Sequence, residues 1–242
     1  MKSLCSDCNQ KSHLEKLNKL ISDGTLDGTE AWSAFSAPKV IKVFTKNNSS
    51  KKVSFTKEEV KTYEVLRKAV AKHLFEKCSG SCSYCRRPVG HYGWAWHIEH
   101  VFAKSTHPSS TFTLSNLTVG CVHCNQWKGR KVDRTFKGNA LPIIDPSLPG
   151  FNYSSHLSYV QISTDSLCFT KYSSRSPEGT KTYENLKFEQ LERCLAINGM
   201  HPPLASLHDR IEKAIRAGLS ANEGQELVDL LFELKNSIYQ IK

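Results

Sequence analysis

Long apolar runs are missing from this chain. No stretch approaches the ~20 apolar residues that a membrane-spanning helix needs, and the opening MKSLCSDCNQ lacks the apolar core of a signal peptide. We therefore expect a soluble cytoplasmic protein. No internal repeat or low-complexity tract is found, so the 242 residues, with ordinary apolar and charged fractions, are expected to form one compact unit with sub-domains.

Acidic residues are scarce, and their shortage is uneven along the chain. Lysine and arginine number 33 against 23 aspartates and glutamates. Residues 1–80 hold 15 basic and 9 acidic residues, residues 81–150 hold 8 and 3, and the remainder holds 10 and 11. A basic surface favours a polyanion such as nucleic acid through phosphate contacts, although a solvated lysine face gives the same composition.

The cysteines are odd in number, so they cannot all pair as disulfides. Six of them form three C-x-x-C pairs, a spacing typical of tetrahedral metal sites, and a reducing cytosol favours zinc over disulfides. Two pairs separated by 35 residues supply a closed four-cysteine set for structural zinc, with buried unligated cysteines as the alternative. The nine cysteines are residues 5, 8, 78, 82, 85, 121, 124, 168 and 194, and the predicted ligands are Cys82, Cys85, Cys121 and Cys124.

Two other groups of possible zinc ligands have to be considered. Cys5, Cys8 and His13 have the residue types for part of a second zinc site, but no fourth ligand can be named. His123 lies inside the second main pair and offers a nitrogen in place of a cysteine. Because four cysteines already suffice, we interpret His123 as facing solvent or DNA.

Apolar spacing and turn residues predict the elements of the first 80 residues. A helix is indicated by leucines at helical spacing, a strand by alternation, and a second helix by the capping box that Thr56 and Glu59 form. In chain order we expect a helix over 12–22, turns at Asp23-Gly24 and Asp27-Gly28, a strand over 40–45, a polar loop over 47–52 and a helix over 57–77.

A segment rich in proline and glycine, Pro142 to Gly150, marks a boundary in the second half. Weak alternation over 157–171 predicts strands, and three helical patterns follow at about 181–198, 203–217 and 221–241. We therefore divide the chain into an N-terminal helical region (1–80), a core with the four-cysteine site (81–141) and a mainly helical C-terminal region (142–242).

An ordered series of polar residues lies between and beyond the two main cysteine pairs. The sequence HIEH covers residues 97–100, and Asn116, Asn125 and Lys128 follow. Over residues 82–131 this series resembles the HNH (ββα-metal) endonucleases. Within them it looks most similar to the Septu- and retron-associated nucleases of anti-phage defence, supported by Ile144-Asp145-Pro146 and by LAING at 195–199.

The resemblance implies an α+β fold in which a zinc-braced ββα-metal core carries N-terminal and C-terminal helical additions. It implies that Glu99 and Asn125 hold a catalytic divalent metal, that His100 is the general base, and that Asn116 braces the loop. Hard oxygen ligands suit Mg²⁺ or Mn²⁺, and a neutral imidazole suits proton abstraction near neutral pH. The family more often has aspartate where Glu99 stands and often histidine where Asn125 stands.

Basic and imidazole side chains near this series are candidate nucleic-acid contacts. His97 lies two residues from Glu99 on the expected strand and so shares its face, which permits a metal contact, although packing or a phosphate contact is the alternative. Five basic residues follow the second cysteine pair and either extend a positive surface or form a solvated helix end. They are Lys128, Arg130, Lys131, Arg134 and Lys137.

The sequence predicts a metal-dependent DNA endonuclease, with products carrying 5′ phosphates by family resemblance. The defence-system likeness implies a separate ATPase partner, for which the near-neutral C-terminal region is the expected docking surface. Two other classes stay open: a non-catalytic zinc module that binds nucleic acid, and an adaptor whose zinc only holds the fold together.

Overall fold

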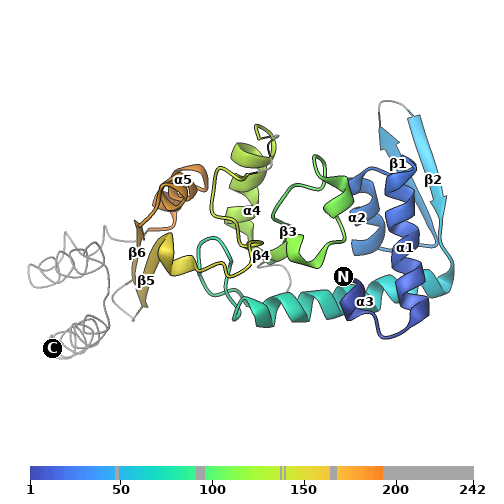
Figure 1. Ribbon diagram of the computed structural model, residues 1–242, viewed down its shortest axis with the longest axis horizontal. Coiled ribbons are helices and arrows are strands. Elements are labelled where there is room, and N and C mark those ends of the chain that lie inside the picture. Colours follow the sequence, from blue (N-terminus) through green and yellow to red (C-terminus); the bar gives the residue numbers. More distant parts are fainter. Residues whose placement is uncertain (47–48, 91–95, 137, 139, 164–167, 193–242) are drawn as a thin grey trace, which may run out of the picture. The chain divides into compact units, whose positions relative to one another are not determined.

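A computed structural model describes residues 1–46, 49–90, 96–136, 138, 140–163 and 168–192 (Figure 1). The chain divides into two compact units, Met1–Phe151 and Asn152–Lys242. Both helix and strand are present, as expected for a mixed fold. Along the described residues, no helix combines the length and apolar character needed to cross a membrane.

Three helices form the first part of unit 1: α1 (Cys8–Ser22), α2 (Gly28–Ser36) and α3 (Lys57–Lys77). Helix α3 begins at the predicted capping box, because Thr56 Oγ1 accepts from Glu59 N at 3.1 Å and Glu59 Oε2 accepts from Thr56 N at 2.8 Å. Its apolar stripe packs against α1 and α2. The core between these helices includes the fully buried Leu14, Leu17, Leu26, Phe35, Tyr63 and Leu66.

Two expectations for this part were wrong. The predicted polar loop over 47–52 contains most of strand β2 (Ser49–Ser54), which pairs antiparallel with β1 (Ile41–Lys46). The predicted turn at Asp27-Gly28 begins α2, since Asp27 Oδ1 accepts from the backbone amides of Thr29 and Glu30. We predicted a loop and a turn for these segments because both are rich in polar residues. In the structure the polar residues of 49–52 form part of a strand, and Asp27 caps a helix.

Strand β3 (Trp96–His100) and strand β4 (Leu117–Cys121) form the second hairpin of unit 1, and helix α4 (Val122–Lys128) follows β4 directly. One π-helical turn, Gly129–Asp133, continues α4. The long helix α3 extends from α1 and α2 toward this second hairpin (Figure 1). Contacts between Phe75 of α3 and Trp96 of β3, with ring centroids 5.9 Å apart, join the two parts.

Unit 2 contains an antiparallel pair, β5 (Leu157–Ser163) and β6 (Cys168–Ser174), followed by α5 (Pro177–Asn185). The strands lie where weak alternation predicted them. Helix α5 begins earlier than the predicted 181–198 because Ser176 caps it and Pro177 occupies its first turn, and it ends before Lys187, whose φ is 56°. The predicted helices over 203–217 and 221–241 and the LAING segment lie outside the described residues.

The first turn of α2 lies directly against the loop that connects β3 to β4. A Cβ on Gly28 would collide with the backbone oxygen of Lys104 and would lie 2.7 Å from Thr111 Oγ1. We therefore expect Gly28→Ala to lower the free energy of unfolding by about 1–3 kcal/mol through overpacking. Chemical denaturation measures this change.

Gly129→Ala is the matched control, because Gly129 has φ −57° and no atom within 4 Å of an added Cβ. Alanine there is expected to be neutral or to stabilise by up to about 1 kcal/mol. Equal stability of the two variants would show that α2 does not pack tightly against the β3–β4 loop.

Candidate functional site

Four cysteines, Cys82, Cys85, Cys121 and Cys124, come together at the base of the second hairpin. Their sulfurs all lie within 4.8 Å of one another, and those of Cys85 and Cys121 are 3.7 Å apart. Four sulfurs at about 2.3 Å from one zinc ion in a tetrahedron lie about 3.8 Å apart, so the cluster fits Zn²⁺. A set of four cysteines would fill the coordination shell of such an ion, as in structural zinc sites.

Backbone geometry shapes each cysteine pair as a tight turn. Arg86 has φ 57°, in the left-handed region, and its amide donates to Cys82 O at 2.9 Å. The amides of Cys121 and Cys124 donate to the sulfurs of Cys82 and Cys121 at 3.3 and 3.4 Å. Hydrogen bonds from neighbouring thiols lower the pKa of Cys121, and donors of this kind favour the thiolate that zinc binds.

The register of β3 and β4 decides which side chains share a face. Glu99 pairs with Thr118 and His97 pairs with Gly120, so these four residues lie on one face of the hairpin. An ideal Cβ on Gly120 would lie 3.0 Å from Glu99 Cβ and 4.0 Å from Asn125 Cβ. The missing side chain therefore leaves a small cradle between Glu99 and Asn125.

The two side chains beside this cradle are of the types that bind hard divalent cations. Glu99, a residue 7 % exposed, has a carboxylate, and Asn125 has a side-chain amide and lies in the first turn of α4, three residues before Lys128. Oxygen donors of these two kinds are the ligands that Mg²⁺ and Mn²⁺ prefer. Burial raises the pKa of the Glu99 carboxyl, and the nearby Lys128 ammonium opposes this rise.

A fully buried lysine, Lys128, joins the hairpin to α4. Its ammonium lies 3.0 Å from Glu99 Oε1, 2.8 Å from His100 O and 2.8 Å from Asp133 Oδ1. Its side chain is 0 % exposed, so the surface position that we expected for Lys128 is wrong. The Lys128 ammonium can be buried because two carboxylates and a carbonyl surround its charge and replace its hydration.

His100 lies on the opposite face from Glu99 and is 3 % exposed. Its Nε2 lies 3.1 Å from Thr111 O, and because a carbonyl only accepts, Nε2 carries the proton and Nδ1 is the acceptor. The Trp32 ring of α2 contacts the imidazole edge to face, with centroids 4.5 Å apart. Burial and the Lys104 charge lower the pKa of His100 to about 3, so the imidazole is neutral at physiological pH.

Asn116, 4 % exposed, holds the loop between the two strands. Its Oδ1 accepts from Phe102 N at 2.8 Å, and its Nδ2 donates to Phe102 O and Ser110 O, both at 3.1 Å. Ser110 precedes Thr111, whose carbonyl contacts His100. The amide side chain therefore fixes the backbone that sets the orientation of the imidazole.

The remaining candidate residues lie at the surface or apart from the cluster. His97 is exposed on the face of Glu99, and the His123 ring lies 6.5 Å from that of Trp127, centroid to centroid. Cys5, Cys8 and His13 are not part of any cluster of metal-binding groups among the described residues. Arg130, Lys131 and Arg134 are exposed, with the Arg130 guanidinium 5.6 Å from the Trp127 ring centre, and Lys137 lies outside the described residues.

Three residues that contact the site were not predicted from the sequence. Asp133 contacts Lys128, and Trp32 and Thr111 contact His100 from outside its strand. A further buried group is the Tyr84 hydroxyl, which has no hydrogen-bond partner among the described residues and whose pKa is raised by burial and by Glu99. The one sequence signal that could have predicted the buried ion pair is that Asp133 follows Lys128 by five positions.

A family model described as HNH endonuclease matches residues 82–131. The match spans both main cysteine pairs, β3, β4 and α4, and thus the residues around the cradle. No curated protein and no solved structure matches the chain. The HNH domain indicates a nuclease or a nucleic-acid-related activity for this segment.

The cluster predicts that the purified protein contains about one zinc ion per chain. Cys85→Ser removes one of four ligands, so we expect it to lose zinc and to unfold at a lower temperature. Elemental analysis by mass spectrometry measures the zinc. Cys78→Ser is the control, since Cys78 is a buried thiol outside the cluster that contacts Ser83 and Thr118; equal zinc loss in both variants would contradict the assignment.

Removal of the buried ammonium should be costly. Lys128→Met leaves Glu99, Asp133 and the His100 carbonyl without their shared partner, and we expect a loss of about 3–5 kcal/mol in the free energy of unfolding. The exposed Lys131 in the following turn gives the control, Lys131→Met, with an expected change within about 0.5 kcal/mol. A Lys128→Met variant as stable as Lys131→Met in urea would show that the ion network is not needed for stability.

Proposed function

We propose that the chain is a metal-dependent HNH endonuclease that hydrolyses phosphodiester bonds of DNA. One observation carries this proposal: within the segment that matches the HNH family, Glu99 of β3 and Asn125 of α4 flank the Gly120 cradle. The zinc held by the four cysteines would have a structural role. The strand, strand and helix would serve as a ββα-metal core.

Glu99 and Asn125 would hold one Mg²⁺ or Mn²⁺ ion. When bound, such an ion stabilises the negative charge that develops on the phosphate and on the leaving oxygen. Lys128 holds Glu99 Oε1 in place through a 3.0 Å contact, so the carboxylate does not have to be ordered when a substrate arrives.

His100 would act as the general base. Its Nδ1 accepts a proton from the attacking water, whose oxygen forms the new bond to phosphorus as the bond to the 3′ oxygen breaks, which leaves a 5′ phosphate. The Thr111 carbonyl fixes the tautomer that leaves Nδ1 free of a proton. Asn116 supports this orientation through Ser110 O, and we assign it a positioning role.

Exposed Arg130, Lys131 and Arg134 would contact backbone phosphates beside the site, where they orient the nucleic acid without reading its sequence. Lys128 is excluded from this set by its burial.

We further propose that this nuclease is the effector of a bacterial anti-phage defence system and acts in the cytoplasm with a separate ATPase. The proposal is supported by the resemblance of the HIEH series to the Septu- and retron-associated nucleases. The near-neutral region 142–242 would carry the docking surface, because its 10 basic and 12 acidic residues leave little positive charge for nucleic acid.

A second function is favoured by the enclosure of His100. Its 3 % exposure and the Trp32 ring against it suit a non-catalytic zinc-containing module that binds nucleic acid, in which the imidazole contributes packing. Turnover by the purified protein separates this function from the first.

Plasmid nicking with Mg²⁺ or Mn²⁺ tests the nuclease directly. We expect His100→Ala and Glu99→Gln to lower the cleavage rate by about 10²–10⁴-fold, because a general base and a metal ligand act in the chemical step. His73→Ala, which changes a half-buried histidine of α3 that does not line the cradle and has no proposed role, should cleave like the unmodified protein.

Zinc content and thermal unfolding show whether each variant is folded. Cleavage by zinc-loaded His100→Ala at the unmodified rate would remove His100 as the base. No cleavage under either metal, with or without an added ATPase partner, while zinc is intact and DNA is bound, would favour the binding module.

A further inference from the structure

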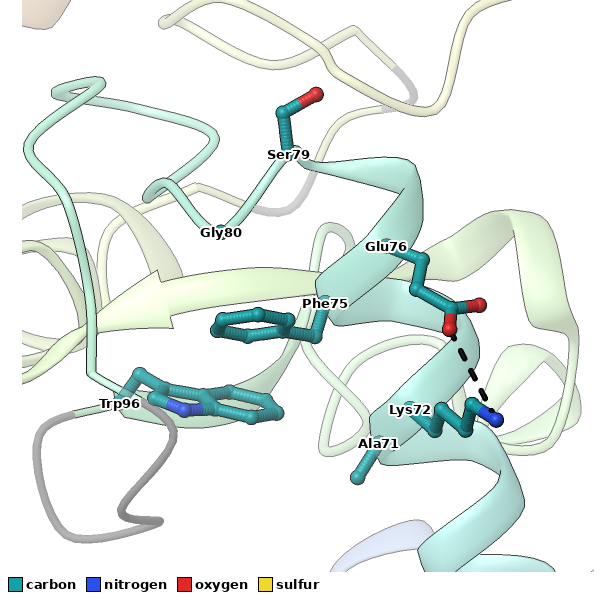
Figure 2. A pocket seen from close by; sticks show the side chains of 7 residues that line it. All are labelled: Ala71, Lys72, Phe75, Glu76, Ser79, Gly80 and Trp96. Atoms are coloured by element: carbon teal, nitrogen blue, oxygen red, sulfur yellow. Dashed lines mark ion pairs between the residues drawn. The ribbon is translucent and has the colours of Figure 1, made fainter.

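A groove runs along α3 beside β3. It consists of two adjoining hollows of about 560 and 320 Å³ that share Ala71 and Trp96 as lining residues. The larger hollow is shown in Figure 2, where the Phe75 and Trp96 rings lie one above the other at its wall and Lys72 and Glu76 lie on the helix at its rim. The two rings are tilted by 36°.

The charge of this groove is mainly positive. Arg67 and Lys68 line the smaller hollow and Lys72 lines the larger one, and Glu76 is the one acid among the described residues that line either hollow. Lys72 and Glu76 are 4.0 Å apart with side chains 79 % and 65 % exposed, so this pair is weak and leaves the ammonium open to a ligand. Arg67 is fixed at the groove by a 3.0 Å bond from its Nη1 to Ser36 O.

The groove also continues into the candidate catalytic hairpin. His97 and Ile98 of β3 line the smaller hollow, directly before Glu99 and His100 in the same strand. A ligand that occupies the groove is therefore next to the strand that carries both residues. The His97 side chain is exposed and is not required for the metal cradle.

We infer that this groove binds a single strand of nucleic acid, with its phosphates at Arg67, Lys68 and Lys72 and a base against the Phe75–Trp96 wall. The inference rests on the proposed nuclease function for its choice of substrate. Cationic grooves with aromatic walls bind unpaired strands, since the charges follow the backbone and each base offers a ring face for stacking. A peptide partner would have to be acidic and would not need the aromatic wall.

Fluorescence anisotropy with labelled oligothymidine, without added divalent metal, tests the inference on the full zinc-loaded chain. We expect Lys68→Glu/Lys72→Glu to raise Kd at least about tenfold at low salt, because the exchange removes two phosphate contacts and adds repulsion. The control is Lys11→Glu/Lys19→Glu, which makes the same charge change on exposed lysines of α1 outside the groove.

An abasic oligonucleotide of equal length tests the aromatic wall, and it should bind more weakly than oligothymidine to the unmodified chain. Equal losses in the two double variants, or equal binding of the two oligonucleotides, would overturn the inference. The anisotropy assay measures binding separately from cleavage. If strand binding depends on Lys68 and Lys72 but the chain cleaves under no condition, the groove inference would be supported and the nuclease proposal would fail. If the unmodified chain cleaves DNA and Lys68→Glu/Lys72→Glu binds the strand as tightly as the unmodified chain does, the nuclease proposal would be supported and the groove inference would fail.

Discussion

Closure of the four-cysteine cluster is the constraint on which the candidate site depends. The first pair lies ahead of β3 and the second pair ends β4 and begins α4, so one zinc ion would hold both ends of the strand–strand–helix segment. Zinc binding at such sites is worth about 10–16 kcal/mol in zinc-finger peptides at neutral pH. That is comparable to the net stability of a typical domain, about 5–15 kcal/mol, so the placement of Glu99 and Asn125 depends on the thiolates.

The buried Lys128 ammonium is the second constraint, and it acts at closer range. A charge without water is stable only where oxygen atoms replace its hydration, and here Glu99, Asp133 and the His100 carbonyl do so at 2.8–3.0 Å. The contacts join β3, α4 and the π-helical turn at one point. The same lysine therefore orders the proposed metal-binding carboxylate and the backbone of the proposed base, while Arg130 and Arg134 beyond it are exposed and are the proposed phosphate contacts.

The parts of the fold and of the candidate site that depend on local sequence patterns could be predicted from the sequence. The Thr56–Glu59 capping box predicted the start of α3 because it depends on residues three positions apart. The cysteine cluster joins two pairs that are distant in sequence, but each C-x-x-C pair is a local pattern typical of a metal site, and the two pairs together complete a set of four ligands. The surface assignment of Lys128 failed because its burial requires Glu99, 29 residues away. The β1–β2 hairpin was missed in its second strand, where serine and lysine gave no apolar alternation. The roles of Glu99, Asn125, His100 and Asn116 in catalysis remain predictions from the resemblance.

The proposed function requires two metal sites of different chemistry in this chain, a closed sulfur site and an open oxygen site at the Gly120 cradle. Electron paramagnetic resonance of the zinc-loaded protein titrated with Mn²⁺ tests it most directly. We expect about one Mn²⁺ bound per chain, with binding lost in Asn125→Ala while zinc is retained. Mn²⁺ binding that is absent, or that is unchanged in Asn125→Ala and in Glu99→Gln, would contradict it.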